Sequence, residues 1–134
     1  MLNNSRVLSK IFDMKNIAVV GMSPKPERPS YYVSVYMSQN GYNIIPVNPG
    51  HNSIMGKTSY SSLLDIKENV DIVNVFRRSE YVLPIINDAV SIKAKAVWLQ
   101  DGIISEEGEK IAKENEMLFI MNDCLLRRHK QYNG

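Results

Sequence analysis

The sequence has a single cysteine, Cys124, and only two histidines among its 134 residues. One cysteine cannot form an internal disulfide, and this sparing usage suits a reducing compartment. One cysteine and two scattered histidines also fall short of any spacing typical of a zinc site, so no metal is expected. No catalytic set of side chains can be identified either, which favours a binding protein over an enzyme.

Long hydrophobic runs are also missing. Apolar stretches such as Ile17 to Met22 are far shorter than the roughly 20 residues that a membrane-spanning helix needs. The segment from Met1 to Phe12 alternates polar and apolar residues, and it lacks the apolar core of a signal peptide. We therefore expect no membrane association and, together with the cysteine usage, a cytoplasmic protein.

An excess of charge of one sign is equally absent. The chain has 16 basic and 14 acidic residues and a net charge of +2, too small to predict a nucleic-acid-binding protein from bulk electrostatics. Hydrophobic residues make up 44% and charged residues 22%, a composition typical of globular domains. A length of 134 residues predicts a single domain over 1–134 with one main site.

What the sequence does contain is a regular alternation of apolar strands and helices. Strands are predicted over 17–20, 42–47, 71–76, 95–99 and 117–121, helices over 30–40, 79–92 and 105–115, a helical lead-in within 1–14 and a helical tail over 124–134. Residues 48–57 are predicted to form a loop, and 60–66 a partial helix. Because the strands are near-continuous apolar runs, we expect them to be buried on both faces. The pattern predicts an α/β fold, a Rossmann-like doubly wound domain with about five parallel strands and helices on both faces.

In such sheets, ligands bind outside the carboxyl ends of the strands, at the point where strand order reverses. The first predicted strand ends at Gly21, where the chain can turn with no side chain in the way. The loop that follows is stiffened by prolines, among them Pro24, and leads to Ser30, which is expected to cap the next helix. Free amides and the dipole at a helix start attract phosphate, so this loop is the first candidate site.

Polar side chains in the same loop suit a pyrophosphate group. Ser23 offers a hydroxyl, and Lys25 and Arg28 supply positive charge just before the helix. The alternative is a proline-stiffened loop that carries a solvated lysine and arginine. Sequence spacing alone leaves both interpretations open.

The dinucleotide fingerprint G-x-G-x-x-G is missing, because only Gly21 occupies its pattern. A conventional NAD site also needs an acidic residue at the end of the second strand. Here that strand ends in Val47, Asn48 and Pro49. A nucleotide other than NAD is therefore the expected ligand.

Two later strand ends carry further candidates. Phe76, Arg77 and Arg78 combine an aromatic face with two guanidinium groups, which suits a purine and an additional phosphate. A core phenylalanine followed by two solvated arginines explains them almost as well. After the fourth strand, Trp98 and Gln100 could lie along a ligand chain, although burial in the core is a somewhat better explanation for Trp98.

Three segments of the sequence strongly resemble the small bacterial CoA-binding domain proteins. They are AVVGMSPKPERPS at 18–30, GYNIIPVNP at 41–49 and VDIVNVFRRS at 70–79. The resemblance extends from about Lys15 to His129, with Cys124 in the expected order. That family looks like the nucleotide-binding domain of the succinyl-CoA synthetase α subunit, which implies a Rossmann fold and coenzyme A (CoA) as the ligand.

The resemblance also implies where the nucleotide half of CoA would bind. Gly21, Ser23 and Arg28 would face the pyrophosphate. Asn48 and Pro49 would flank the nucleotide. The pyrophosphate would then be held by the first strand-to-helix loop.

For the rest of CoA, the resemblance implies that Phe76 and Arg77 approach the adenine or the 3′-phosphate, and that Trp98 and Gln100 lie toward the pantetheine arm. The synthetase carries its phosphorylated histidine in a second domain, and this histidine has no match here. We therefore do not expect acyl-CoA synthesis by this chain alone.

Cys124 and His129 could be argued to form a thiol and base pair. Their spacing places them about 140° apart on an ideal helix, so no local pair is implied, and we expect a buried structural cysteine. The basic run from Arg127 to Lys130 could contact nucleic acid, but cations at the end of a C-terminal helix also complement its dipole, and we favour this explanation.

The sequence thus predicts non-catalytic binding of CoA or acyl-CoA. Two alternatives from other classes stay open. One is a regulatory protein that binds another adenine nucleotide, and the other is an enzyme that acts on CoA thioesters or uses Cys124 in thiol exchange. The sequence also leaves open a protein partner or a homodimer.

Overall fold

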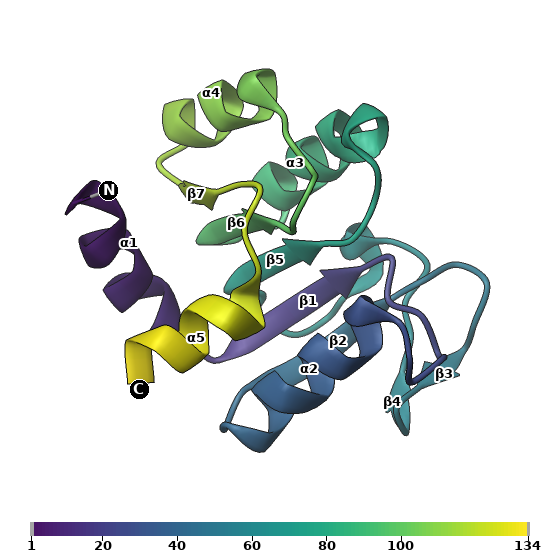
Figure 1. The fold of residues 1–134 in the computed structure, drawn as a ribbon. Helices are drawn as coiled ribbons and strands as arrows, with labels where there is room; N and C mark the ends of the chain where they lie inside the picture. The colour runs from purple at the N-terminus through teal and green to yellow at the C-terminus, as the bar shows by residue number, and fades with distance from the viewer. Residues whose placement is uncertain (1, 134) are drawn as a thin grey trace.

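The structure, a computed structural model, describes residues 2–133. Helices pack on both sides of a central sheet (Figure 1). The elements in chain order are α1 (Leu2–Phe12), β1 (Asn16–Val20), α2 (Pro29–Gln39), β2 (Asn43–Val47), β3 (Ser53–Ile54), β4 (Lys57–Thr58), η1 (Leu63–Asp65), β5 (Ile72–Val75), η2 (Ser79–Tyr81), α3 (Val82–Ser91), β6 (Ala96–Leu99), α4 (Glu106–Glu114), β7 (Leu118–Ile120) and α5 (Leu125–Asn133).

The main sheet has five strands in the order β2-β1-β5-β6-β7, and all neighbouring strands are parallel. The chain leaves β1 for β2 on one side and then crosses back to β5 on the other side of β1. Strand order therefore reverses between β1 and β5, where open sheets bind their ligands. This topology confirms the predicted α/β Rossmann-like fold with five parallel strands.

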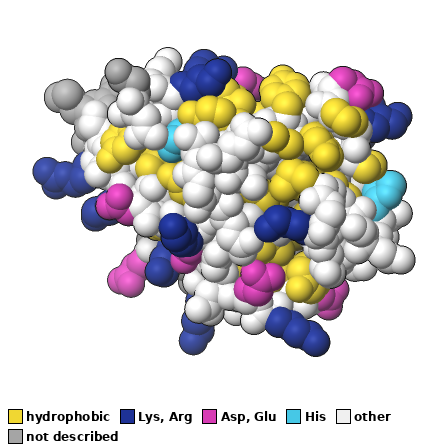
Figure 2. Space-filling view, turned by 90° about the horizontal axis from the view of Figure 1, so that it is seen from below, with side chains coloured by type: hydrophobic (Ala, Val, Ile, Leu, Met, Phe, Trp, Pro, Cys, Tyr) yellow, Lys and Arg dark blue, Asp and Glu magenta, His cyan; other side chains and the backbone are white. Residues whose placement is uncertain are grey.

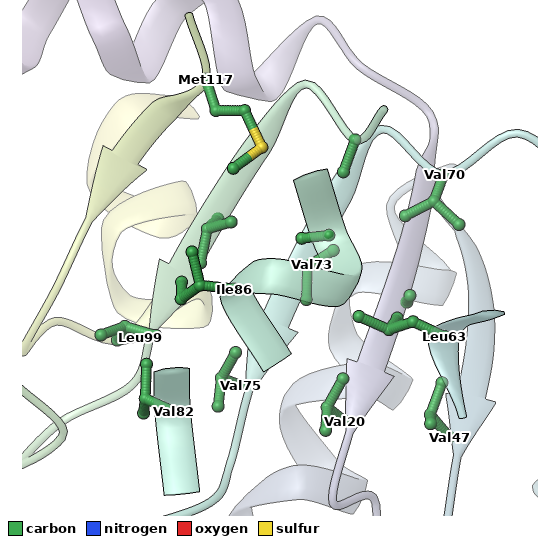
Figure 3. Packing of buried hydrophobic residues seen from close by; sticks show 14 of the residues in the cluster. Val20, Val47, Leu63, Val70, Val73, Val75, Val82, Ile86, Leu99 and Met117 are labelled. Atoms are coloured by element: carbon green, nitrogen blue, oxygen red, sulfur yellow. The ribbon is translucent and has the colours of Figure 1, made fainter. Parts of the chain in front are cut away.

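Each face of the sheet buries its own hydrophobic cluster. Helices α3 and α4 cover one face, where Val75 of β5 lies near Val82 and Ile86 of α3 (Figure 3). Farther along the same cluster, Val20 of β1 and Val47 of β2 lie near Leu63 of η1. Helices α1, α2 and α5 cover the other face through residues such as Ile11, Met37 and Leu125. Burial on both faces explains why the strands are continuous apolar runs in the sequence.

A small hairpin departs from the prediction of a loop over 48–57. Strands β3 and β4 pair Ser53 with Thr58 and Ile54 with Lys57 in antiparallel register. The turn between them places Met55 at φ 58° and Gly56 at φ 70°, the two positive values of a type I′ turn. Strands of two residues are too short to produce an alternating pattern, so no periodicity predicts them.

The molecular surface carries charges of both signs. On the face shown in Figure 2, basic side chains are scattered among acidic ones, mostly around a band of apolar side chains. Within residues 2–133, no helix combines the length and the apolar character that crossing a bilayer requires.

At the amino ends of the strands, Asp71 joins β1 to β5. Its Oδ2 accepts hydrogen bonds from the backbone N–H groups of Lys15 (3.1 Å) and Asn16 (2.9 Å), and its Oδ1 lies 3.4 Å from the Lys95 ammonium. Burial alone would raise the pKa of Asp71, but these amide hydrogen bonds and the lysine outweigh it and lower the pKa below the ordinary value of 3.8. The ionised carboxylate therefore stabilises this edge of the sheet.

We expect Asp71→Asn to lower the free energy of unfolding at pH 7 by about 1–3 kcal/mol, because charge-assisted hydrogen bonds are lost. The folded pKa is depressed, so the contribution of Asp71 is complete above the unfolded value of 3.8 and is lost as the pH falls through the folded pKa. Urea unfolding curves at pH 7 and near pH 3 measure the free energy of unfolding. The difference in this free energy between the variant and the wild type should shrink at the lower pH.

Lys95→Ala is the matched control, since the Lys95 side chain is 67% exposed and such pairs contribute at most about 1 kcal/mol. A loss as large as that of Asp71→Asn would mean that the ion pair, rather than the amide hydrogen bonds, joins the strands.

Candidate functional site

Gly21 stands where β1 ends and strand order reverses. Its N–H donates to the Val47 carbonyl of β2 at 2.9 Å, and Phe76 donates to the Val20 carbonyl at 2.9 Å. Gly21 has φ +84°, and a Cβ on it would lie 2.9 Å from both the Phe76 carbonyl oxygen and the Arg77 Cδ. Only glycine permits this close approach between the ends of β1 and β5.

The loop after Gly21 is shaped by its own hydroxyl groups. Ser30 Oγ accepts a hydrogen bond from the Ser23 N–H at 2.8 Å, and Ser23 Oγ accepts one from the Lys25 N–H at 3.1 Å. The prediction that Ser30 caps the helix is therefore wrong. Helix α2 begins at Pro29 with Arg28 as its N-cap, and Ser30 lies inside the first turn, from which it holds the loop instead.

The same loop presents positive charge at the start of α2. Pro24, Lys25 and Arg28 are exposed, and the Arg28 side chain makes no capping hydrogen bond to the helix. A helix start without a side-chain cap keeps amide dipoles available to an anion. The predicted phosphate-binding groups therefore remain accessible.

Two pockets open along this edge of the sheet. The larger has a volume of about 540 Å³ and is lined by the start of α2, by the segments that follow β5 and β6, and by one residue before α5. These are Pro29, Tyr32, Val33, Phe76, Arg77, Arg78, Ser79, Gln100, Asp101, Gly102, Ile103 and Cys124. We call it the large pocket.

The second pocket, about 280 Å³ in volume, lies over the ends of β1 and β2. It is lined by Val20, Gly21, Val47, Pro49, Ser61, Ser62, Leu63, Arg77, Tyr81, Pro84, Ile85 and Asp88. We call it the small pocket. Arg77 lines both pockets, and its guanidinium carbon lies 4.8 Å from the centre of the Tyr81 ring.

Several predicted site residues meet at these pockets and others do not. Gly21 and Pro49 line the small pocket, Phe76 and Gln100 line the large one, and Arg77 lines both. The residues of the 23–30 loop that were predicted line neither pocket.

Asn48 ties two strand ends together. Its Nδ2 donates to the Met22 carbonyl at 2.8 Å, and its Oδ1 accepts from the Gly50 N–H at 2.8 Å. Both ends of the side chain are therefore used within the protein, and Asn48 lines neither pocket. Its contribution is to position the loop that carries Pro49.

The resemblance implied that Trp98 lies toward the pantetheine arm, but the structure places it elsewhere. The side chain is fully buried, and its Nε1 donates to the Asp123 carbonyl at 2.9 Å. Trp98 lies inside β6 and points into the core beside Phe12, so the predicted contact is contradicted. Only residues beyond the end of the strand, such as Gln100, reach the edge of the sheet.

Gln100 is the most buried polar side chain of the large pocket. It is 5% exposed, and its Oε1 accepts a hydrogen bond from the Leu125 N–H at 3.1 Å. Among the residues that the structure describes, none accepts a hydrogen bond from its Nε2. An amide donor that no described residue uses, on a side chain that lines a pocket, is a feature expected of ligand-binding sites.

The expectation of a buried cysteine is wrong, although Cys124 does pack against the hydrophobic cluster under α1, α2 and α5. Cys124 is only half-buried and lines the large pocket. His129 is no base for it, because the two ring nitrogens lie 2.8 Å from the Tyr36 hydroxyl and 3.0 Å from the Asn133 amide. Burial also lowers the pKa of His129, so its ring favours the neutral form.

The prediction that the basic run near the C-terminus complements the helix dipole holds for Lys130, which lies in the last turn of α5, but not for the two arginines. Arg127 and Arg128 lie in the first turn of α5, where cations do not complement the helix dipole. Arg127 instead binds Asp101 at 2.8 Å and Asp123 at 3.1 Å, and Arg128 lies 3.1 Å from Asp123. The hydrogen bond from Arg127 lowers the pKa of Asp101, which lines the large pocket.

Sequence reasoning missed two tyrosines of the pockets. Tyr32 and Tyr81 are exposed aromatic side chains that line the large and the small pocket respectively. Tyr81 follows Arg77 by four residues, a spacing that brings two side chains together only if the segment between them turns helically. The contact between Tyr81 and Arg77 could therefore be predicted only by assuming such a turn. Nowhere in the described part of the chain do three or more His, Cys, Asp or Glu side chains gather as a metal site.

The family described as CoA binding domain matches residues 15–130, which include all five strands of the main sheet and both pockets. The chain belongs to the CoA-binding domain family.

Relatives of this CoA-binding domain include small proteins and parts of large ones. The uncharacterized protein YneT of Bacillus subtilis is 42% identical over 115 residues, covering 86% of this chain and 85% of that protein. A solved structure from Thermus thermophilus matches with a TM-score of 0.90 at 35% identity, covering 96% of this chain and 97% of that one.

The ADP-forming acetate–CoA ligase II of Archaeoglobus fulgidus is 31% identical over 108 residues. The match covers 79% of this chain but only 16% of the ligase. The CoA-binding domain thus corresponds to a small part of that enzyme.

The contact at Gly21 gives a test of the site's architecture. Gly21→Ala is expected to lower the free energy of unfolding by more than Gly41→Ala, measured by urea unfolding. Both glycines have positive φ, but nothing lies within 4 Å of a Cβ on Gly41, so that variant carries only the backbone cost of about 1–2 kcal/mol. Equal losses would show that β1 and β5 do not need this close approach.

Proposed function

We propose that this chain binds coenzyme A at the carboxyl edge of its sheet without catalysing a reaction. The adenosine end occupies the small pocket, the pyrophosphate lies along the Gly21 loop and the start of α2, and the pantetheine arm enters the large pocket. The observation that carries this proposal is that Arg77 lines both pockets. One elongated ligand can therefore contact Arg77 while it occupies both.

The shapes of the pockets support an elongated ligand. Volumes of about 540 and 280 Å³ are in or near the range of small-molecule sites. The Gly21 loop, whose glycine lines the small pocket, runs on to Pro29, which lines the large one. The start of α2 therefore borders the large pocket, and a helix start is suited to a pyrophosphate.

The charges of the site support an anionic ligand. Arg77 and Arg78 follow β5, and the exposed Lys25 and Arg28 lie in the first loop. Because the net charge of the whole chain is only +2, this local gathering is not a consequence of a basic protein. Guanidinium groups bind phosphate through paired hydrogen bonds, so the three phosphates of CoA suit this edge.

The lining of the large pocket supports the pantetheine end. Pro29, Val33 and Phe76 supply apolar surface, which suits the methylene and methyl groups of the arm. The free Nε2 of Gln100 suits one of its amide carbonyls. Free CoA and acyl-CoA share this arm, so the proposal covers both.

We expect calorimetry to show binding of CoA that is tighter than binding of dephospho-CoA, ADP or NAD, because these lack a phosphate or the arm. Arg77→Ala should weaken CoA binding roughly tenfold to a hundredfold, the effect of losing a charged hydrogen bond of about 1.5–3 kcal/mol. Arg6→Ala, which removes an exposed arginine of α1, is the matched control and should bind as the wild type does.

Binding of ADP or NAD in preference to CoA would contradict the proposal and favour a regulatory protein for another adenine nucleotide. An equal loss of affinity in Arg77→Ala and Arg6→Ala would contradict the proposed location of the site.

A further inference from the structure

The thiol of Cys124 lies at the end of the proposed path of CoA. Cys124 is the only cysteine of the sequence, and it follows β7 and directly precedes α5 at the carboxyl edge of the sheet. It is half-buried and lines the large pocket together with Phe76 and Gln100. A ligand arm that fills this pocket therefore meets the thiol.

A second, independent feature of the pocket points to a ligand at this place. Gln100 is more than nine-tenths buried and lines the large pocket, yet none of the described residues accepts a hydrogen bond from its Nε2. A ligand carbonyl in the pocket can accept this hydrogen bond in place of water. The Gln100 Oε1 accepts a hydrogen bond from the N–H of Leu125 at 3.1 Å. Leu125 directly follows Cys124, so this hydrogen bond holds the Gln100 side chain next to the cysteine segment.

The charges around the pocket favour a disulfide that carries phosphates. Arg77 and Arg78 line the pocket that contains Cys124. Positive charge at the mouth of a cleft raises the local concentration of anions and their rate of encounter. CoA disulfide brings several phosphates to these arginines, whereas glutathione disulfide brings only carboxylates, which are singly charged.

We propose that Cys124 captures CoA covalently by thiol–disulfide exchange with CoA disulfide, a proposal that rests on the proposed function. The Cys124 thiolate attacks one sulfur of the CoA disulfide, a new S–S bond forms between Cys124 and that CoA, and the original S–S bond breaks. The second CoA leaves as a thiolate and takes a proton from water. The two electrons of the broken bond go with it, so no further oxidant is needed.

The test compares two disulfides on the whole protein. Reduced, desalted protein is mixed with CoA disulfide or with glutathione disulfide, and the adduct is followed by intact mass spectrometry without reductant. We expect one CoA per chain, removable by dithiothreitol and absent in Cys124→Ser. The adduct with CoA disulfide should form at least about tenfold faster than that with glutathione disulfide, because binding places the reacting sulfur at Cys124.

Three comparisons distinguish a reaction that depends on CoA binding in the large pocket from the reaction of an accessible thiol alone. Excess desulfo-CoA, which lacks the thiol, should slow the reaction with CoA disulfide. Arg77→Ala should slow it as well, while Arg6→Ala should react as the wild type does. Similar rates for the two disulfides, or no CoA adduct, would overturn covalent capture.

Calorimetry with CoA under reducing conditions distinguishes this failure from failure of the proposed function. If CoA binds reversibly but the two disulfides react alike, covalent capture is wrong and the proposed function stands. If CoA does not bind and the disulfides react alike, both proposals are wrong.

Discussion

The backbones of β1 and β5 approach one another at the point where the strand order reverses, and the architecture of the site depends on this approach. A side chain on Gly21 would collide with the Phe76 carbonyl and with Arg77. Because this space is left free, Arg77 can lie across the end of β1 and line both pockets. The glycine therefore determines the position of the arginine, and the arginine connects the two pockets.

The two edges of the sheet have different roles. At the amino ends of the strands, Asp71 joins β1 and β5 through hydrogen bonds within the protein. At the carboxyl ends, the Gln100 amide and the arginines after β5 keep hydrogen-bonding capacity that the described residues do not fully use. The capacity to bind a ligand is thus concentrated at the carboxyl edge.

Much of the fold followed from the sequence, because strands buried on both faces are continuous apolar runs that helices separate. Gly21 and Arg77 were also predictable, since both follow the ends of such strands. The roles of Ser30, Trp98 and Cys124 were not, because they depend on which way a side chain points and on which segments meet across the sheet. The β3–β4 hairpin was missed because two-residue strands carry no periodic signal.

Hydrogen exchange with mass spectrometry, with and without CoA, tests most directly the claim that CoA binds along this edge. The account predicts that CoA slows exchange in 21–31, 76–81 and 100–103 and leaves α4 unchanged. Protection confined to the amino edge around Asp71, or no protection in these three segments when CoA is bound, would contradict it.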